Sequence, residues 1–362
     1  MNLLFITHAR LTDLPYGDGS TRYRCFNLAE VARQAGYRAS VLSASSVTTD
    51  HLDNFDIVSW LRPLASAHLF RLIDKAKARG MLCVADLDDL IINPDLANQS
   101  PAVINQFVKP SHLRRRFSKH AAAMECFDAL TVSTSALEEQ VSELYPDKPV
   151  ATVRNGLSDY WMQHVQTVSS DYPTQQIASY LPGTRSHDED LRSIAPALRR
   201  WLTGNSQRQL SIVGKLALDD SLRLSDRVMQ RSWVDYYSLP SVISSCNCSL
   251  APLSNTIFNQ AKSHIKFIEA AALGVPSIAT QIPDYSDHNV QGLLLPTSQE
   301  LWFESLELAT NQGFRMAHAE NLRAYAADYC SAAKYTTPLL QAWDSGQPVP
   351  MCTSSDTRTQ AA

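Results

Sequence analysis

The residues whose types and spacing most clearly suggest chemistry are Lys262, Lys266 and Glu269. Steps of four and three residues place them on one face of a helix of about three turns, with Ser263 as its N-cap and a Gly-x-Pro sequence at 274–276 as its end. Two ammonium groups near the free N–H groups of a helix start favour an anion such as a diphosphate. A carboxylate one turn further on can accept hydrogen bonds from sugar or ribose hydroxyls. The plainer interpretation is a solvated Lys/Glu face.

The sequence around these residues is more specific than their spacing. From residue 259 to residue 276 it reads N-Q-A-K-S-H-I-K-F-I-E-A-A-A-L-G-V-P, which resembles the donor-site element of GT-B glycosyltransferases, particularly the bacterial family-4-like enzymes. In that family the Glu of a Glu-Ala-x-x-x-Gly-x-Pro phrase contacts the ribose of the donor, which implies this role for Glu269. The family usually has an acidic residue with seven residues between it and that Glu. Ala261 stands there in this chain, so the group that contacts the transferred sugar is left open.

A second candidate element is the loop after the first expected strand of the second half. It reads Gly183-Thr184-Arg185-x-His187-x-x-Asp190. Glycine lets the backbone approach a phosphate, and Thr184 and Arg185 can donate hydrogen bonds to it. A plain strand-to-helix turn is the alternative. Similar glycosyltransferases carry a Gly-Thr-x-x-His-x-x-Asp phrase here, which implies donor contacts for its first, second and fifth residues and a catalytic charge for Arg185.

The resemblance implies further donor-side residues. Many relatives neutralise the diphosphate with an Arg and a Lys about five residues apart, but Asp190 stands where the Lys is expected. We therefore expect Lys262, as a catalytic cation, or Lys215 to supply the second charge. Trp233 lies where this fold usually packs the nucleobase, although an aromatic residue in such a cluster is more often part of a core.

An acidic cluster, Asp86-Leu87-Asp88-Asp89, follows an expected buried strand in the first half. One interpretation is the Asp-x-Asp metal clamp of the other glycosyltransferase fold, GT-A. The second α/β half and the Lys/Glu helix argue against that fold. The resemblance instead assigns the cluster to acceptor hydroxyls without a metal, with Asp88 as the catalytic base if the enzyme inverts configuration.

Arg22 and Arg24 lie at the start of the first expected helix, after Gly17 and Gly19. We expect them at the carboxyl end of a strand, where open α/β sheets bind ligands, and assign them to the acceptor side of the site, as contacts to an acceptor or to the donor phosphate. A solvated helix start is the alternative. The two glycines lack the third one of a dinucleotide fingerprint, which disfavours a dehydrogenase. The basic stretch 109–120 could contact anionic lipid or a lipid diphosphate, or be a solvated helix face.

Length and pattern define the expected architecture. A chain of 362 residues is long enough for two ordinary domains, and apolar runs alternate with helical patterns in both halves. We predict the α/β class and, from the resemblance, a GT-B fold with two Rossmann-like domains facing a cleft. The predicted parts are an acceptor domain at 1–165, a donor domain at 166–316, a helix at 317–343 that crosses back to the first domain, and a disordered tail at 344–362.

Composition narrows the function. A net charge of −4 gives no electrostatic reason to expect a nucleic acid. No apolar run approaches the ~20 residues of a membrane span, the first strand begins too early for a signal peptide, and seven scattered cysteines favour the reducing cytoplasm.

The resemblance thus implies a cytoplasmic glycosyltransferase, with weak peripheral contact at the inner face of the membrane. It would need no cofactor, and it would move a sugar from a nucleotide-diphosphate sugar to a hydroxyl of a carbohydrate or lipid-linked glycan. The alternatives are a catalytically silent nucleotide-sugar-binding partner subunit, which Ala261 favours, and a sugar-nucleotide epimerase or phosphorylase on the same fold.

Overall fold

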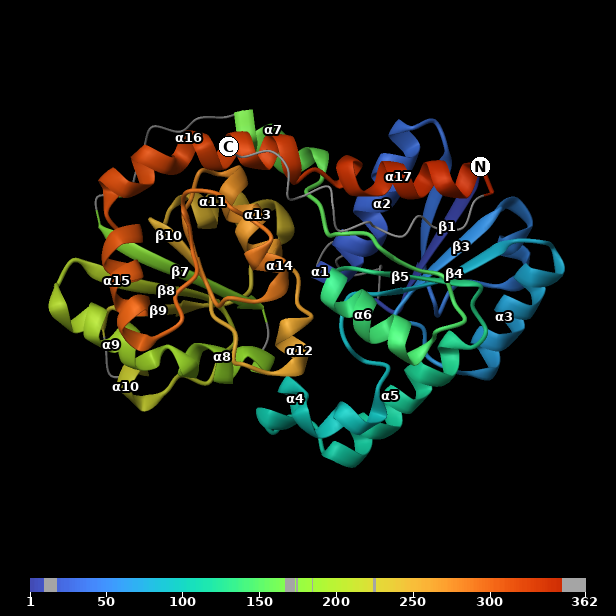
Figure 1. Cartoon of the computed structure of the whole chain (residues 1–362), viewed down its shortest axis with the longest axis horizontal. Helices are drawn as coiled ribbons and strands as arrows, with labels where there is room; N and C mark the ends of the chain where they lie inside the picture. The colour runs from blue at the N-terminus through green and yellow to red at the C-terminus, as the bar shows by residue number, and fades with distance from the viewer. Residues whose placement is uncertain (10–17, 167–172, 174, 184, 224–225, 347–362) are drawn as a thin grey trace.

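The computed structural model describes residues 1–9, 18–166, 173, 175–183, 185–223 and 226–346. Nearly all of the predicted tail at 344–362 lies outside the described residues. The rest forms two α/β lobes that lie side by side (Figure 1). Each lobe contains one six-stranded parallel sheet. The predicted class, with two Rossmann-like domains, is confirmed.

The sheet of the first domain has the strand order β2-β1-β3-β4-β5-β6. In β1, Leu4 and Ile6 belong to the core on one face of the sheet, and Leu3 and Phe5 to the core on the other. A continuous apolar run is typical of a strand that helices cover on both faces. The strands are β1 (Asn2–Thr7), β2 (Arg38–Ser43), β3 (Ile57–Leu61), β4 (Leu82–Leu87), β5 (Ala129–Val132) and β6 (Val150–Thr152).

The sheet of the second domain has the order β12-β11-β10-β7-β8-β9. Its two outer strands are short, and β9 ends at Arg231. The strands are β7 (Gln176–Gly183), β8 (Arg208–Gly214), β9 (Val228–Arg231), β10 (Cys248–Ala251), β11 (Ser277–Ala279) and β12 (Leu293–Leu294).

Helices connect the strands of both sheets. In the first domain they are α1 (Gly19–Thr21), the π-helical segment η1 (Arg22–Phe26), α2 (Asn27–Gln34), α3 (Ala67–Ala78), α4 (Pro101–Ile104), α5 (Pro110–Met124) and α6 (Ser135–Leu144). Later in the chain they are α7 (Asp159–Gln166), α8 (Asp188–Ser193), α9 (Ala195–Gly204), α10 (Asp220–Arg223), α11 (Leu239–Ser244), α12 (Ile257–Gln260), α13 (Ile265–Ala272), α14 (Pro283–Ser286), α15 (Gln299–Ala309), α16 (Gln312–Tyr329) and α17 (Ala332–Asp344). Short 3-10 turns lie at Thr49–Asn54, Pro94–Gln99, Arg185–His187 and Tyr236–Ser238.

Two helices differ from the sequence-based expectation. The residue pattern predicts Ser20 as the N-cap of the first helix. The N-cap is instead Asp18, because its carboxylate accepts a hydrogen bond from the backbone N–H of Thr21. The residue pattern also predicts one long helical region at about 102–126, which the structure divides into α4 and α5. Gln106 lies between them with a φ of 60°, a left-handed conformation that a continuing helix does not allow.

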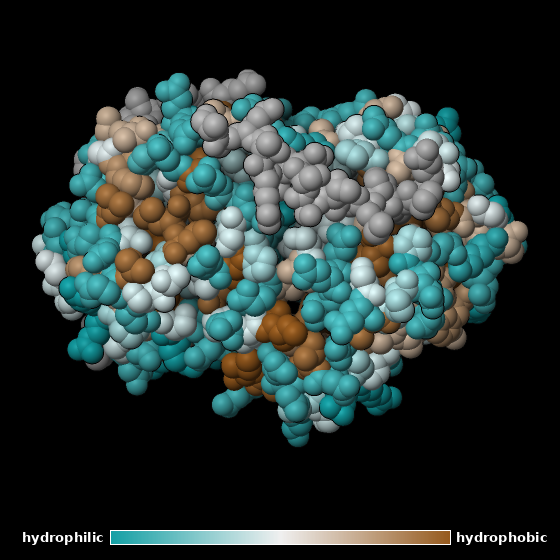
Figure 2. All heavy atoms as spheres, viewed as in Figure 1, coloured by the Kyte–Doolittle hydropathy of each residue, from teal (hydrophilic) through white to brown (hydrophobic). Residues whose placement is uncertain are grey.

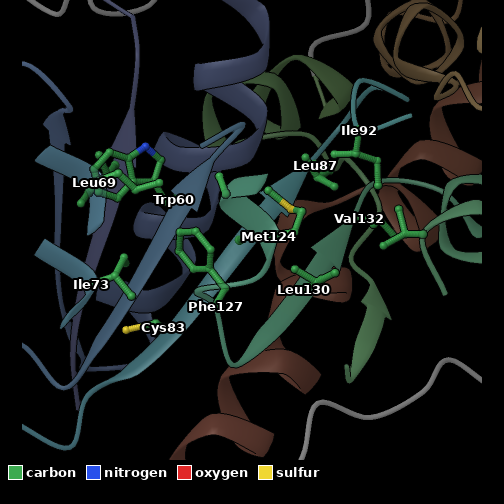
Figure 3. Packing of buried hydrophobic residues seen from close by; sticks show 14 of the residues in the cluster. Trp60, Leu69, Ile73, Cys83, Leu87, Ile92, Met124, Phe127, Leu130 and Val132 are labelled. Carbon is green, nitrogen blue, oxygen red and sulfur yellow. The ribbon is translucent and has the colours of Figure 1, made fainter. Parts of the chain in front are cut away.

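A buried cluster supports the strands that carry the acidic residues of the first domain. Trp60 of β3 belongs to it, with Leu69 and Ile73 of α3 and with Phe127 before β5 (Figure 3). Close packing of large side chains fixes the positions of β3 and β4 relative to the helices. The ends of these two strands are therefore rigid supports for the residues that follow them.

The chain crosses between the domains twice. The C-terminal α17 packs on α2, and Leu339 and Trp343 share a core with Leu28, so the end of the chain crosses back to the first domain as predicted. The single helix expected at 317–343 is instead divided into α16, which packs against α13 of the second domain, and α17. At Leu157, where the chain first crosses, it forms hydrogen bonds with the segment of the second crossing. The N–H of Leu157 donates to the carbonyl of Cys330 (2.7 Å), and its carbonyl accepts from the N–H of Ala332 (2.8 Å). Helix α7, nearly all of which the predicted boundary at residue 165 assigned to the first domain, packs with the core of the second domain.

On the face shown in Figure 2, hydrophilic residues cover most of the surface of both lobes. None of the helices in the described part of the chain is long and apolar enough to cross a membrane.

Candidate functional site

Helix α13 lies at the interface between the domains, but it begins later than the sequence suggests. It runs from Ile265 to Ala272, with His264 as its N-cap residue, so the N-cap role predicted for Ser263 is wrong. The hydroxyl of Ser263 instead accepts a hydrogen bond from Asn155 of the first domain (3.0 Å). Lys262 consequently lies in the loop before the helix, and Lys266 lies in the first turn. The predicted end is confirmed, since Gly274 has a φ of 64°.

A buried carboxylate of α14 takes over the capping function. Asp284 accepts a hydrogen bond from the backbone N–H of His264 (2.8 Å) and forms an ion pair with the imidazole of the same residue. Arg154, which follows β6 of the first domain, donates to Asp284 (2.6 Å) and to Asp287 (2.5 Å). The start of α13 is therefore held by a buried charge network that reaches into the first domain.

Glu269 faces the first domain from the middle of α13. Its side chain is buried, with the residue 8% exposed, and Oε1 accepts a hydrogen bond of 2.6 Å from the hydroxyl of Tyr23. Burial raises the pKa of Glu269 to about 7, while the hydrogen bond from Tyr23 and the charge of Lys266 oppose this rise. Burial also lowers the pKa of Lys266. The predicted ribose contact is therefore a carboxyl group that titrates near neutral pH.

Lys262 pairs with the acidic cluster of the first domain. Its ammonium lies 2.5 Å from Asp89, which also accepts from Arg62 (2.6 Å), and Arg62 forms a further ion pair with Asp88. Burial disfavours the charge of Asp89, but Lys262 and Arg62 outweigh this effect and lower its pKa to about 2. Asp88 and Asp89 are thus at the interface as predicted, yet both are engaged by cations.

Arg24 and Asp86 form a buried pair, which corrects the expectation that they face an acceptor. Arg24 is 1% exposed and donates two hydrogen bonds to Asp86, of 2.8 and 2.5 Å. Thr131 donates another to Asp86 (2.6 Å), and Arg24 also bonds Asn155 (3.2 Å). Removing two charges from water is favourable only with such complete pairing. This pair positions the surrounding segments and presents no free charge to a ligand.

Arg22 is also buried rather than open to an anion. It pairs with Glu30 (3.3 Å), and its guanidinium lies 4.8 Å from the centre of the Tyr236 ring. The π-helical segment η1 carries Arg22, Tyr23 and Arg24. The acceptor-side prediction for the two arginines therefore placed them correctly beside the interface but misjudged their exposure.

The loop after β7 is organised around Asp190. This residue is 2% exposed and accepts hydrogen bonds from His187 (2.7 Å), from the backbone and hydroxyl of Ser254 (both 2.8 Å), and from Asn259 (3.0 Å). It therefore joins the Gly183 loop to the segment before α13. Burial lowers the pKa of His187, and the positive charge of Lys266 lowers it further, so the His187 ring lies within electrostatic reach of the helix that carries Glu269.

Asn105 of the first domain forms two hydrogen bonds with the same loop. Asn105 donates to the carbonyl of Ser186 (2.9 Å) and accepts from the N–H of Glu189 (3.0 Å). The exposed Arg185 pairs with Asp188 (3.1 Å), and its guanidinium lies 4.9 Å from the centre of the Phe107 ring. Arg185 is thus accessible, as a diphosphate contact requires.

The remaining donor-side predictions differ in their placement. Gly183 ends β7, opposite Gly214 of β8. Lys215 and Trp233 are both exposed after neighbouring strands, Trp233 with 44% of its surface. Thr184 lies outside the described residues.

Several residues of this site were not predicted from the sequence: Tyr23, Arg62, Asn105, Arg154 and Asp284. Arg62 has a φ of 48° directly before a proline, and such backbone strain is found at functional sites. Only its place after a buried strand could have drawn attention to it. The others contact the site through partners at least 20 positions away in the chain, which no local pattern indicates.

The alternative of a metal clamp finds no support in the arrangement of the acidic cluster. Its three carboxylates are paired with Arg24, Arg62 and Lys262. In the described ranges no group of three or more His, Cys, Asp or Glu residues could hold a metal ion. A cavity of about 550 Å³ lies elsewhere, lined by Ile57, Leu82 and Trp343 among others. Those residues lie away from the carboxyl ends of the strands, so we do not assign the site there.

A comparison with protein families matches part of the second domain. Residues 184–311 match the family described as glycosyl transferases group 1, a segment that includes Lys262, Lys266 and Glu269. The sequence has no match among curated proteins.

Solved structures match over much more of the chain. HepE of Anabaena, in complex with UDP-glucose, is 13% identical and has a TM-score of 0.64, covering 95% of this chain and 100% of its own. An alpha-glucosyltransferase in complex with UDP and DNA is 12% identical, with a TM-score of 0.66 and coverage of 94% and 98%. A mutant form of TarM of S. aureus, in complex with UDP, is 12% identical with a TM-score of 0.57. The match covers 82% of this chain and 57% of the TarM chain.

At these identities the solved structures show the fold, and the family match lies in the domain that carries the lysines and the glutamate. Together they show a GT-B fold whose second domain is similar to the glycosyl transferases group 1 family over residues 184–311. The second domain is the part that the glycosyl transferases group 1 family describes.

Proposed function

We propose that the protein transfers a sugar from a nucleotide-diphosphate sugar to an acceptor hydroxyl, in the assembly of a polysaccharide or another glycan. The observation that carries this proposal is the position of Lys262, Lys266 and Glu269. They lie at the interface of the two domains, beside the loop after β7 that contains His187. Ligands of open α/β sheets bind at the carboxyl ends of the strands, where this group lies.

The chemistry follows from the charges. Lys262, Lys266 and the exposed Arg185 would neutralise the negative charge that develops on the leaving diphosphate. Glu269 would accept hydrogen bonds from hydroxyls of the donor. Closure of the domains excludes water, which strengthens these interactions. Because side chains supply the positive charge, we propose that no metal ion takes part.

The acceptor side is proposed from the first domain. Asp88 lies at the interface and is the candidate base, although it must first be released from Arg62. On α5, Arg114, Arg115 and Arg116 are exposed. They support a weak peripheral contact with an anionic membrane surface, and hence a lipid-linked glycan as the acceptor.

The experiment that tests the function is a thermal-shift screen with UDP, GDP, dTDP, ADP and CDP, each with and without magnesium. A diphosphate at about 100 times its dissociation constant should add about 2.7 kcal/mol to the free energy of unfolding. Stabilisation by one diphosphate, independent of magnesium, is expected. No stabilisation by any of them would contradict the proposal, and stabilisation only with magnesium would contradict its metal-independent form.

A second candidate, a silent nucleotide-sugar-binding subunit, is favoured by one observation. Ala261 is 3% exposed, and its carbonyl accepts a hydrogen bond from Thr134 of the first domain (3.0 Å). The position that is acidic in the resembling enzymes therefore carries no carboxylate here. Diphosphate binding without hydrolysis or transfer of the sugar from any nucleotide-sugar would support this candidate.

A further inference from the structure

The hydrogen bond between Tyr23 and Glu269 joins the two domains at a buried carboxyl group of the site. Tyr23 belongs to η1 of the first domain and Glu269 to α13 of the second, 246 positions later in the chain. The oxygen atoms are 2.6 Å apart, and the residues are 3% and 8% exposed. A short hydrogen bond to a buried carboxylate is a strong interaction.

The neighbours of Tyr23 aim its ring at Glu269. On one side, Arg24 is fixed by its two hydrogen bonds to Asp86. On the other, Arg22 contacts the ring of Tyr236 in the second domain. All three side chains of this π-helical segment are buried, and such π segments are frequent at functional sites.

Other ionisable groups surround Glu269, but they act differently. Lys266 lies one turn before it on α13 and interacts through its charge. Tyr236 and Tyr285 approach from the turn before α11 and from α14, and the hydroxyl of Tyr236 pairs with Ser158 (2.9 Å). Within the described ranges, the Tyr23 hydroxyl is the group that donates a hydrogen bond to the Glu269 carboxylate.

We propose that Tyr23 is a positioning residue of the donor site: its hydroxyl fixes the orientation of the Glu269 carboxylate, so that binding of donor hydroxyls at Glu269 depends on contact with the first domain. The inference rests on the proposed function, because it takes Glu269 as the group that binds those hydroxyls. The same hydrogen bond favours the ionised carboxylate, against the burial that raises the pKa of Glu269 to about 7. Tyr23 thereby makes the second domain's binding residue sensitive to the position of the first domain.

The test is Tyr23→Phe, which removes one hydroxyl and keeps the ring. The probe is whichever of UDP, GDP, dTDP, ADP and CDP stabilises the wild-type protein most, titrated by calorimetry from pH 6 to pH 9. We expect affinity at pH 7 to fall about tenfold, since a hydrogen bond to a charged group contributes on this scale. The loss should shrink as the pH rises and Glu269 ionises without help. The matched control is Tyr236→Phe, which removes a hydroxyl from the same interface without touching the bond to Glu269, and should keep the wild-type pH profile.

Thermal unfolding gives a readout that needs no ligand. The pKa of Glu269 in the folded protein lies above its value in the unfolded chain, so its contribution to stability is complete below about pH 4 and is lost as the pH rises through about 7. Glu269→Gln should remove this loss. Tyr23→Phe should move it to higher pH, because the folded carboxyl group is then harder to ionise.

The outcomes separate this inference from the function on which it rests. If Glu269→Gln leaves the affinity for the diphosphate unchanged, the proposed donor site fails. If Glu269→Gln weakens binding but Tyr23→Phe matches the wild type at every pH, the positioning role alone fails. It also fails if Tyr23→Phe tightens binding, or if it weakens binding equally at every pH and leaves the pH midpoint of unfolding unmoved.

Discussion

Lys262 of the second domain forms an ion pair with Asp89 of the first, with 2.5 Å between Nζ and Oδ1, although 173 positions separate the two residues in the chain. A predicted donor-site cation and a predicted acceptor-side carboxylate thus neutralise each other across the interface. A diphosphate that binds Lys262 must compete with this carboxylate. Anion binding is therefore coupled to the contact between the domains.

Releasing Lys262 should strengthen diphosphate binding. In Asp89→Asn the ammonium loses its competing carboxylate, and we expect the affinity for the diphosphate to rise by a factor of about two to five, since a partly exposed ion pair contributes up to about 1 kcal/mol. Calorimetric titration measures this change. The control is Asp88→Asn, which removes a carboxylate held by Arg62 but not by Lys262, and should leave the affinity unchanged. A weaker affinity in Asp89→Asn would show that Asp89 itself supports the ligand.

Removing the donor-site groups themselves should weaken binding. We expect Lys262→Ala and Glu269→Ala each to reduce the affinity for the diphosphate by about tenfold to a hundredfold, because each removes a charge-assisted hydrogen bond. Circular dichroism should show the wild-type fold in both. Lys75→Ala, on the exposed side of α3, is the matched control and should bind like the wild type. Unchanged affinity in both site variants would remove the donor-site assignment.

The buried network at the start of α13 should control stability in acid. Burial disfavours the charge of Asp284, but His264 and Arg154 outweigh this effect and lower its pKa to about 2. This value lies below that of the unfolded chain, so Asp284 contributes stability above about pH 4 that is lost as the pH falls towards 2. We expect Asp284→Asn to lower the free energy of unfolding by about 3 kcal/mol at pH 7, since it leaves a buried charge unpaired. In this variant the free energy of unfolding should also depend less on pH between pH 4 and pH 2.

Urea unfolding from pH 2 to pH 7 measures both effects. The control is Asp287→Asn, because Asp287 pairs with the same Arg154 but its side chain is 37% exposed. Its cost should stay below about 1 kcal/mol. Equal costs for the two variants would contradict the role given to the buried pair.

The crossing point of the two interdomain segments should not tolerate a side chain. A Cβ added at Gly156 would lie 2.5 Å from the Cα of Ala332 and 2.8 Å from the carbonyl carbon of Ser331. Both contacts are with backbone, so Gly156→Ala must push the segments apart, at a cost of about 1–3 kcal/mol in the free energy of unfolding. Gly19→Ala is the control, because nothing lies within 4 Å of its added Cβ. A melting temperature of Gly156→Ala equal to that of the control would contradict this packing.

Sequence reasoning located the elements of the fold well. Continuous apolar runs marked the buried strands, as in the run Leu3–Ile6 of β1. It was less successful where a partner from another part of the chain decides the outcome. Ser263 does not cap α13, because the carboxylate of Asp284 accepts the hydrogen bond from the backbone N–H of His264. The expected helix at 102–126 is divided near Asn105, whose side chain forms a hydrogen bond with Ser186 of the second domain.

The sequence by itself determined the two α/β halves, the loop after β7 and the phrase that carries Lys262 and Glu269, because periodicity, turn residues and helix ends depend on near neighbours in the chain. Only the tertiary structure decided the electrostatic state of these groups. Whether Glu269 is hydrogen-bonded by Tyr23, or Lys262 neutralised by Asp89, depends on pairings across 246 and 173 positions. Burial and pairing set the charge of a side chain, and both arise only when distant segments are packed together.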